Sequence, residues 1–394
     1  MKIEFTPEQL ALQQEIRDYM KGIVTPALRQ EMKDPEHREG GGPEFRKQYA
    51  KMGADGWISL SWPKSLGGQE ATPMEQYIFT DEVLASGFAY PFLTTDAVGP
   101  VLAEHANDEV RDEAVKGIVE GRSIVAIGYS EPGAGTDLAS LTTKAEKDGD
   151  SWLINGQKMW TSLANFSDYI WLAARTDPDV SKKHKGLTMF LVPIDTPGVS
   201  LTPVWTMGVR TNASYFENVR ISDKYRVGEV NKGWRLITGQ LNRERLSLVN
   251  HGPVHILFTE VAQWAATTTS SDGKTLIEKP WVQNNLAKVK VRLEALRMMC
   301  LKQAWAMTEN NLGMAEASAA KVYGSEFFVE AYRLLLEIMG QAGILREDSP
   351  GAILQGKIEH RYRVGSILTF GGGTNEVQRD IISAAGLWMP RASR

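Results

Sequence analysis

The hydrophobic periodicity of this 394-residue chain changes twice, which excludes any fold built from one type of secondary structure. Up to Arg122, apolar residues recur at helical spacing. From Ser123, short β-branched and aromatic runs follow one another without a helical pattern between them, and from about Gly233 the helical spacing returns. We expect a helical domain over 1–122, a β domain over 123–229 and a helical bundle over 230–394. Four long helices are predicted for the bundle: Trp234–Asn250, His255–Thr267, Pro280–Leu312 and Ala315–Met339.

Within the β segment, the dipeptide Asn155-Gly156 separates two runs of strand-forming residues, 152–154 and 157–160. Asn-Gly is a strong signal for a two-residue hairpin turn, because both turn residues need a positive φ. We therefore predict a hairpin here, within a small antiparallel sheet or barrel. The expected fold class is mainly α with a middle antiparallel β domain.

The composition excludes several classes of function. The chain has 44 Lys and Arg against 48 Asp and Glu, a net charge of −4, and no basic block, which argues against a nucleic-acid partner. No run of about 18 apolar residues predicts a membrane span, and the first ten residues do not resemble a signal peptide. The single cysteine, Cys300, excludes an intrachain disulfide and a cysteine metal cluster. We expect no metal site and a cytoplasmic location.

A glycine-rich segment, Gly128–Asp137, opens the β domain and is followed by Asn155–Ser162. Small residues allow backbone N–H groups to approach an anion or a flat ring closely. The segment is not a dinucleotide-binding fingerprint, because Leu138 stands where the third glycine would be. On the residues alone, a tight turn followed by a hairpin explains the two segments equally well.

Together, these two segments resemble the flavin-binding signature of the acyl-CoA dehydrogenases, and Gly373–Arg379 is similar to the closing motif of that family. The resemblance covers the whole chain. It implies an N-terminal helical domain, a β-barrel-like middle domain and a C-terminal four-helix bundle. It also implies noncovalent FAD, an acyl-CoA thioester as substrate, and a reaction in which the α-hydrogen leaves as a proton and the β-hydrogen as a hydride to the flavin.

The resemblance assigns site residues position by position. The cofactor-binding residues that it implies are Tyr129, Ser130, Gly135, Thr136, Trp160, Thr161, Ser162, Thr374 and Glu376. Two of these depart from the family pattern, since Ser162 stands where a threonine is usual and Glu376 where many members have glutamine. The implied substrate-binding residues are Thr136, Arg245, Gly371, Gly372 and Gly373.

The catalytic base is implied on a helix of the bundle. Many members carry a carboxylate directly before the glycine of the closing motif, but that position here is Gly372. Members resembling isovaleryl-CoA dehydrogenase instead carry the glutamate on the first helix of the bundle, and Leu241–Arg245 of this chain matches their pattern. The resemblance therefore implies that Glu244 is the base and that Arg245 either binds CoA or has a structural role. The alternative is an ordinary Glu-Arg pair on a solvated helix face.

Three glycines, Gly371–Gly373, stand near the expected reacting carbons. The missing side chains suggest room for a bulky or branched acyl group, and the backbone N–H of Gly372 could bind the thioester carbonyl. The alternative is that these glycines only permit a tight loop.

Residues that a neighbouring subunit lends to FAD in homotetrameric members are missing here. The corresponding positions are Thr269 and Asp272, and Glu337 replaces an expected glutamine. The chain in this respect resembles the base-bearing subunit of heteromeric acyl-CoA dehydrogenases of actinobacterial steroid side-chain degradation. That resemblance implies a heterotetramer with a homologous chain, a steroid-CoA substrate, and electron transfer flavoprotein as the oxidant.

Three other interpretations stay open at this point. The first is a homotetrameric dehydrogenase for branched or aromatic acyl-CoA. The second is a flavin oxidase or monooxygenase on the same fold. The third is a subunit without a base that completes the site of a partner.

Overall fold

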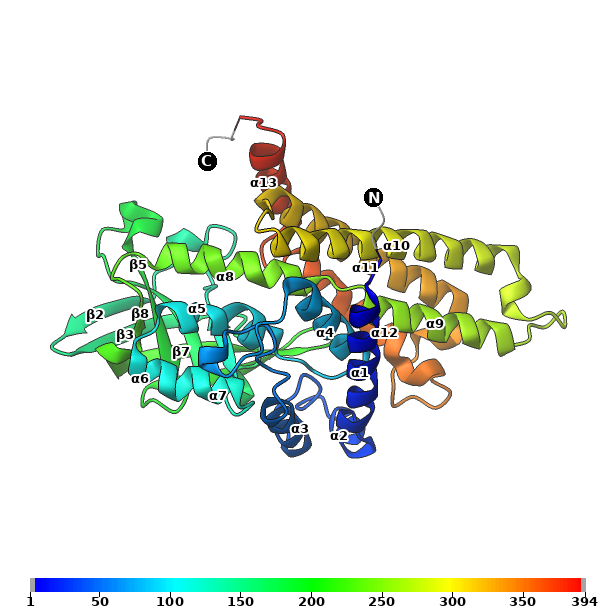
Figure 1. Cartoon of the computed structure of the whole chain (residues 1–394), viewed down its shortest axis with the longest axis horizontal. Helices are drawn as coiled ribbons and strands as arrows, with labels where there is room; N and C mark the ends of the chain where they lie inside the picture. The colour runs from blue at the N-terminus through cyan, green and yellow to red at the C-terminus, as the bar shows by residue number, and fades with distance from the viewer. Residues whose placement is uncertain (1–3, 391–394) are drawn as a thin grey trace. The chain divides into compact units, whose positions relative to one another are not determined.

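The computed structural model describes residues 4–390, apart from the side chains of Arg245 and Leu246 (Figure 1). The contacts between residues divide the chain into two compact units. Unit 1 comprises the chain up to Gly22, Thr72–Phe88 and the part from Arg245 onward. Unit 2 comprises Ile23–Ala71 and Ala89–Glu244. This division does not follow the three domains expected from the sequence, whose boundaries stay a prediction.

Unit 1 is helical. Its described helices are α1 (Pro7–Ile23), α4 (Pro73–Ala85), α9 (Gly252–Thr267), α10 (Pro280–Thr308), α11 (Met314–Met339), α12 (Lys357–Gly365) and α13 (Asn375–Ile381). Helix α8 (Gly233–Leu248) begins in unit 2 and ends in unit 1. Helices α9, α10, α12 and α13 all contact α11, and Val289, Leu293 and Leu335 are completely buried in the shared core. The four predicted long helices are confirmed, with boundaries shifted by a few residues.

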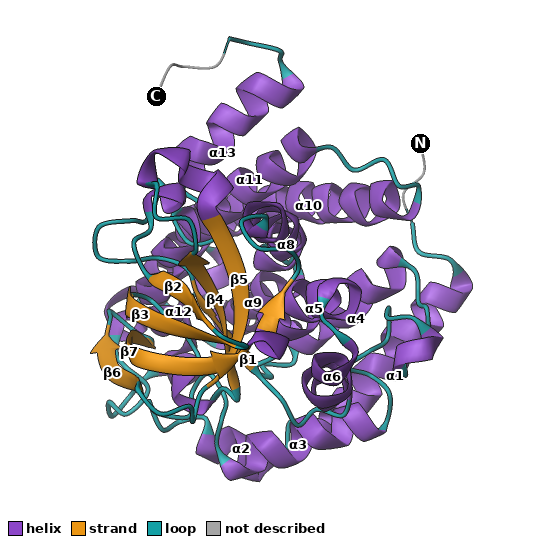
Figure 2. Ribbon diagram, turned by 90° about the vertical axis from the view of Figure 1, so that its left-hand side faces the viewer, coloured by secondary structure: helices purple, strands orange, loops and turns teal. Residues whose placement is uncertain are grey.

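Unit 2 contains the sheet, whose strands lie side by side in Figure 2. Its strands are β1 (Val125–Gly128), β2 (Lys144–Asp148), β3 (Ser151–Lys158), β4 (Tyr169–Arg175), β5 (Leu187–Pro193), β6 (Val199–Trp205), β7 (Arg210–Ser222) and β8 (Arg226–Val227). The order is β6-β7-β3-β2-β4-β5-β8, and β1 pairs with β4. Most pairs are antiparallel, as expected, but β4 runs parallel to both β1 and β2. The predicted fold class is confirmed.

Strand β4 is buried along its whole length and separates two parts of the core. Tyr169, Trp171 and Ala173 contribute to the larger cluster, while Ile170 and Leu172 pack with residues of β3, β5 and β7. This division follows from the alternation of side chains across a strand.

The helices of unit 2 are α2 (Pro26–Glu31), α3 (Pro43–Ala54), α5 (Gly99–His105), α6 (Asp108–Val110) and α7 (Lys116–Val119). Leu102 of α5 and Ile118 of α7 belong to the larger core cluster, as do Leu236 and Ile237 of α8. The part of α8 that belongs to unit 2, which ends at Glu244, is therefore fixed against the same core as β4.

The predicted hairpin at Asn155-Gly156 is wrong, because both residues lie inside the single strand β3. The register against β7 shifts between Ile154 and Gly156, so the dipeptide forms an irregularity within the ladder. The Asn155 side chain accepts a hydrogen bond from the backbone N–H of Asn218 (2.8 Å). A Cβ atom at Gly156 would lie only 2.7 Å from the Thr143 Cα, so the close approach of the neighbouring segment explains the glycine.

Within residues 4–390, no helix is long and apolar enough to cross a membrane. Cys300 is a free, buried thiol, and burial raises its pKa well above the ordinary value. The expected cytoplasmic location stays a prediction.

Candidate active site

A buried ion pair anchors the glycine-rich segment that opens the β domain. Lys158, at the end of β3, is completely buried, and its Nζ lies 2.8 Å from the Glu131 carboxylate. The same Nζ donates a hydrogen bond to the Tyr129 carbonyl (3.0 Å). Glu131 also accepts hydrogen bonds from the backbone N–H groups of Thr142 and Thr143. The beginning of the segment is therefore tied to β3 and to the chain before β2.

The electrostatics of this pair reflect its burial. Burial by itself raises the pKa of Glu131, but the charge of Lys158 and the hydrogen bonds from Lys158, Thr143 and Thr142 outweigh it and bring the value to about 2. Burial lowers the pKa of Lys158 to about 8, although Glu131 acts in the opposite direction. Both groups are charged at neutral pH.

Beyond this anchor, the segment presents exposed backbone. Gly133, Gly135 and Thr136 are exposed. A Cβ atom at Gly133 or Gly135 would meet no other atom within 4 Å, so protein packing does not require glycine at either position. Space next to backbone N–H groups suits a ligand that must approach the main chain closely.

The residues after β3 lie next to the glycine-rich segment, because the Met159 N–H donates a hydrogen bond to the Ser130 carbonyl (2.8 Å). Trp160 has a positive φ of 62° and a 55% exposed side chain. Thr161 is completely buried, and its Oγ1 has no hydrogen-bond partner among the described residues. The Ser162 hydroxyl lies 3.1 Å from that of Thr211. A flat aromatic surface and an unsatisfied hydroxyl thus stand beside the glycine-rich segment.

Glu244 lies on the buried side of α8 and is only 8% exposed. The Gln240 side-chain amide, one turn earlier, donates to Glu244 Oε2 (2.8 Å). The Tyr129 hydroxyl donates to Gln240 Oε1 (2.9 Å) and accepts from the Trp171 indole N–H (2.8 Å). The interpretation of Glu244 as part of a solvated helix face is therefore wrong. Arg245 follows it in the helix, but its side chain lies outside the described residues.

The Tyr129 side chain, which the family resemblance assigns to the cofactor, is 7% exposed and hydrogen-bonded to α8 and β4. Burial raises the pKa of its phenol well above the ordinary value, and the Glu244 charge adds to this effect. The predicted cofactor contact of Tyr129 stays a prediction.

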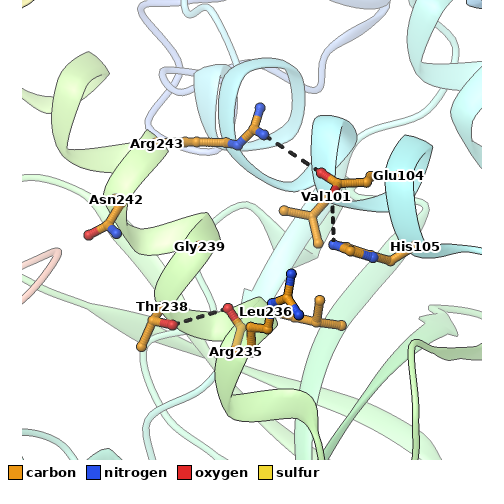
Figure 3. Close-up of a pocket in the computed structure, with 9 residues that line it drawn as sticks. All are labelled: Val101, Glu104, His105, Arg235, Leu236, Thr238, Gly239, Asn242 and Arg243. Carbon is orange, nitrogen blue, oxygen red and sulfur yellow. Dashed lines mark hydrogen bonds and ion pairs between the residues drawn. The ribbon is translucent and has the colours of Figure 1, made fainter. Parts of the chain in front are cut away.

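A cavity of about 310 Å³ lies between α5 and α8 (Figure 3). The Glu104 carboxylate, which lines it, lies 3.4 Å from His105 Nε2 and 3.9 Å from Arg243 Nη2, and the Arg243 charge partly balances that of Glu104. Glu244 is not one of its lining residues, which are Val101, Glu104, His105, Arg235, Leu236, Thr238, Gly239, Asn242 and Arg243. The cavity thus opens on another side of α8 from the buried carboxylate.

The closing motif belongs to unit 1. Gly372 and Gly373 have φ values of 67° and 92°, so backbone conformation alone favours glycine at both positions. The tight-loop interpretation explains these two residues, and the room for a bulky acyl group does not follow from them. The Gly373 carbonyl accepts a hydrogen bond from buried Lys321 (2.7 Å), and a Cβ atom at Gly371 would lie 3.0 Å from the Ile367 carbonyl.

After these glycines, Thr374 is the N-cap of α13 and its side chain accepts from the Val377 N–H (3.2 Å). Glu376 is exposed, and hydrogen bonds from its own backbone and from Thr374 lower the pKa of its carboxyl.

The loop that contains Thr269 and Asp272 also lies in unit 1. The Asp272 carboxylate accepts hydrogen bonds from the side chains of Lys279 and Ser270. These bonds, together with one from the Lys274 backbone, hold the pKa of Asp272 far below its ordinary value. Thr269 forms a β-bridge with Thr275. Elsewhere in the unit, Glu337 accepts a hydrogen bond from Asn285 (3.0 Å).

Family models match nearly the whole chain. The N-terminal, middle and C-terminal domain models of acyl-CoA dehydrogenase match residues 6–122, 126–221 and 231–387, respectively. The chain belongs to the acyl-CoA dehydrogenase family. This confirms the family resemblance found in the sequence, and members of this family of oxidoreductases use FAD.

This acyl-CoA dehydrogenase is 46% identical to the acyl-CoA dehydrogenase FadE26 of Mycobacterium tuberculosis, with complete coverage of both chains. A chain of the ChsE4-ChsE5 complex from M. tuberculosis has 46% identity, a TM-score of 0.92 and complete coverage of both chains. A chain of a structure described as the Tcur3481-Tcur3483 steroid ACAD has 42% identity and the same TM-score and coverage.

The residues of unit 2 fit a flavin in three respects. The Thr161 hydroxyl lacks a partner among the described residues, Gly135 borders open space, and the Trp160 indole is exposed. Sequence reasoning missed the Lys158–Glu131 pair and the hydrogen bonds of Gln240 and Trp171. The i, i+4 spacing of Gln240 and Glu244 could have indicated their contact, but only the fold brings Trp171 and Tyr129 to α8.

Proposed function

We propose that this chain is the base-bearing subunit of a heteromeric, FAD-dependent acyl-CoA dehydrogenase that acts on the CoA thioester of a bulky, steroid-derived side chain. The observation that carries this proposal is the buried Glu244 carboxylate, which Gln240 hydrogen-bonds on α8. Removal of an α-proton needs a base that is shielded from water. The names of the steroid ACAD and of the two-component ChsE4-ChsE5 complex support the substrate class and the heteromer.

In the proposed reaction, Glu244 accepts the α-proton of the acyl group. The negative charge that develops on the thioester oxygen would be stabilised by the Gly372 backbone N–H. Bound FAD would supply the acceptor for the β-hydride, and we propose electron transfer flavoprotein as the oxidant that completes the cycle.

The cofactor-binding residues in this proposal are Tyr129, Ser130, Gly135, Thr136, Trp160, Thr161, Ser162, Thr374 and Glu376. Thr136, Arg245 and Gly371–Gly373 would contact the acyl-CoA. Exposed backbone at Gly135 and the unsatisfied Thr161 hydroxyl support these assignments.

The heteromer proposal has support in unit 1. The Asp272 carboxylate stays ionised and is bound to Lys279, and an anion at this position repels a diphosphate. If a second copy of this chain lent this loop to the cofactor, the contact would be unfavourable. A homologous chain with cationic residues there would bind the cofactor better.

The visible absorption spectrum tests the heteromer. We expect the chain purified alone to contain little flavin, and the chain co-purified with a homologous subunit to contain it near stoichiometry. A stoichiometric flavin band in the homo-oligomer would refute the shared site and favour a homotetrameric enzyme for branched or aromatic acyl-CoA.

The Glu244→Gln variant tests the base. In the flavin-loaded enzyme, it should abolish exchange of the α-proton of a steroid side-chain CoA thioester with D₂O while the flavin stays bound. Glu229→Gln is the matched control, because it removes an exposed carboxylate shortly before the same helix. Retained exchange in Glu244→Gln would contradict the assignment and favour a non-catalytic subunit. Oxygen consumption that matches substrate oxidation would instead favour an oxidase or monooxygenase.

A further inference from the structure

We propose that Tyr129 and Gln240 are positioning residues, which hold the Glu244 carboxylate in one orientation through a directional hydrogen-bond chain that begins at Trp171. We call the residues Trp171, Tyr129, Gln240 and Glu244 the Glu244 hydrogen-bond chain. The inference rests on the proposed role of Glu244 and adds to it the residues that set the direction of its carboxylate.

The direction of this chain follows from the chemistry of its first member. An indole N–H can only donate, so the Tyr129 hydroxyl must accept from Trp171 and direct its single proton elsewhere. That proton points to Gln240 Oε1. The Gln240 amide is thereby oriented, because its oxygen faces Tyr129 and its NH₂ group faces Glu244. If the Gln240 amide were reversed, its NH₂ group would face the Tyr129 hydroxyl proton and its oxygen would face the Glu244 carboxylate, and both contacts are unfavourable.

Burial makes this arrangement stringent. Gln240 and Trp171 are completely buried, and Tyr129 is nearly so. Unpaired polar groups are costly in such surroundings, so alternative orientations with a broken hydrogen bond are strongly disfavoured. The phenol also stays protonated at neutral pH, because burial raises the pKa of Tyr129 well above its ordinary range. Tyr129 is therefore a permanent donor to Gln240.

The chain also links the proposed base to the glycine-rich segment. The Tyr129 carbonyl accepts from Lys158, whose position is fixed by the ion pair with Glu131. Tyr129 is thus held through both its main chain and its phenol. A ligand bound at the backbone of this segment would have a defined position relative to the Glu244 carboxylate. Proton transfer requires such alignment, and small displacements of a reacting group cost large factors in rate.

The test measures α-proton exchange of the flavin-loaded complex with Tyr129→Phe, with Gln240→Met and with the two changes combined. We expect Gln240→Met to lower kcat for exchange about tenfold to hundredfold with KM unchanged, since Glu244 Oε2 loses the hydrogen bond from the Gln240 amide. Tyr129→Phe should lower kcat less, by about threefold to tenfold. In the Gln240→Met background, Tyr129→Phe should have no further effect on kcat, because Tyr129 acts through Gln240.

Tyr49→Phe is the matched control for the tyrosine. Tyr49 is completely buried in unit 2, and its hydroxyl has no hydrogen-bond partner within residues 4–390. This change should leave kcat, KM and flavin content as they are. Flavin content and the unfolding midpoint of each variant separate a loss of structure from a loss of alignment.

Different outcomes separate the two proposals. If Glu244→Gln abolishes exchange but Gln240→Met and Tyr129→Phe leave kcat unchanged, the positioning role is refuted and the base stands. The positioning role is also refuted if Gln240→Met lowers flavin content and the unfolding midpoint together with kcat, since the variant has then lost structure. Additive effects of the two changes on kcat in the double variant would refute it as well. If Glu244→Gln retains exchange, the proposed base fails and the positioning role fails with it.

Discussion

Breaking the buried ion pair between Glu131 and Lys158 should destabilise the protein more than removing both charges. The Glu131→Gln variant leaves the Lys158 ammonium completely buried without the carboxylate that neutralises it. The neutral Tyr129 carbonyl still accepts a hydrogen bond from Lys158. The double variant Glu131→Gln/Lys158→Met also removes the ammonium, and Met preserves the unbranched shape of the lysine side chain. The comparison isolates the cost of an uncompensated buried charge.

The magnitude follows from the burial of the pair. Burial disfavours the charged Lys158 and lowers its pKa to about 8, whereas the partners of Glu131 favour its charged form and lower its pKa to about 2. Desolvation and attraction oppose each other, so the intact pair adds little net stability. Loss of one partner should cost about 3–5 kcal/mol, and the double variant should recover about half or more of that loss.

The assay is urea denaturation followed by tryptophan fluorescence, with the same flavin content in all samples. Glu146→Gln is the control, because Glu146 forms an exposed pair with Lys144 (3.3 Å) and should change the free energy of unfolding by less than about 1 kcal/mol. A Glu131→Gln variant as stable as this control would refute the reasoning. So would a double variant that is less stable than the single one.

Two further predictions concern pH and the irregular strand. Because the pKa of Glu131 is lowered from 4.5 to about 2, its ionised carboxylate stabilises the fold at pH values above 4.5, and this contribution should be lost as the pH falls towards 2. The free energy of unfolding, measured as a function of pH, should show this loss in the wild type and a much smaller one in Glu131→Gln. Gly156→Ala should lower the free energy of unfolding by about 1–3 kcal/mol, because its Cβ would lie 2.7 Å from the Thr143 Cα. Gly22→Ala is the control, because Gly22 lies in α1 with open space around its Cβ and should lose no stability; equal losses in the two variants would contradict the steric argument.

Much of the fold could be predicted because hydrophobic periodicity is a local property of the chain. The four long helices and the change to strands at Ser123 depend on spacing within single segments, so the sequence predicted them well. Asn155-Gly156 shows the limit of such reasoning. A hairpin signal assumes that the strand ends at the dipeptide, but pairing with β7 continues β3 through it.

The sequence by itself determined the family, through motifs whose residues are adjacent in the chain, and the family resemblance implied Glu244 as the base because Gly372 has no carboxylate. Tertiary structure decided the surroundings of that carboxylate. Glu244 is buried because α8 packs on the core that includes Trp171 of β4, and its hydrogen-bond chain joins residues from the glycine-rich segment, β4 and α8. Such contacts link positions up to 111 residues apart. Local patterns carry no record of them, because burial and hydrogen bonding between distant segments arise only when the chain is folded.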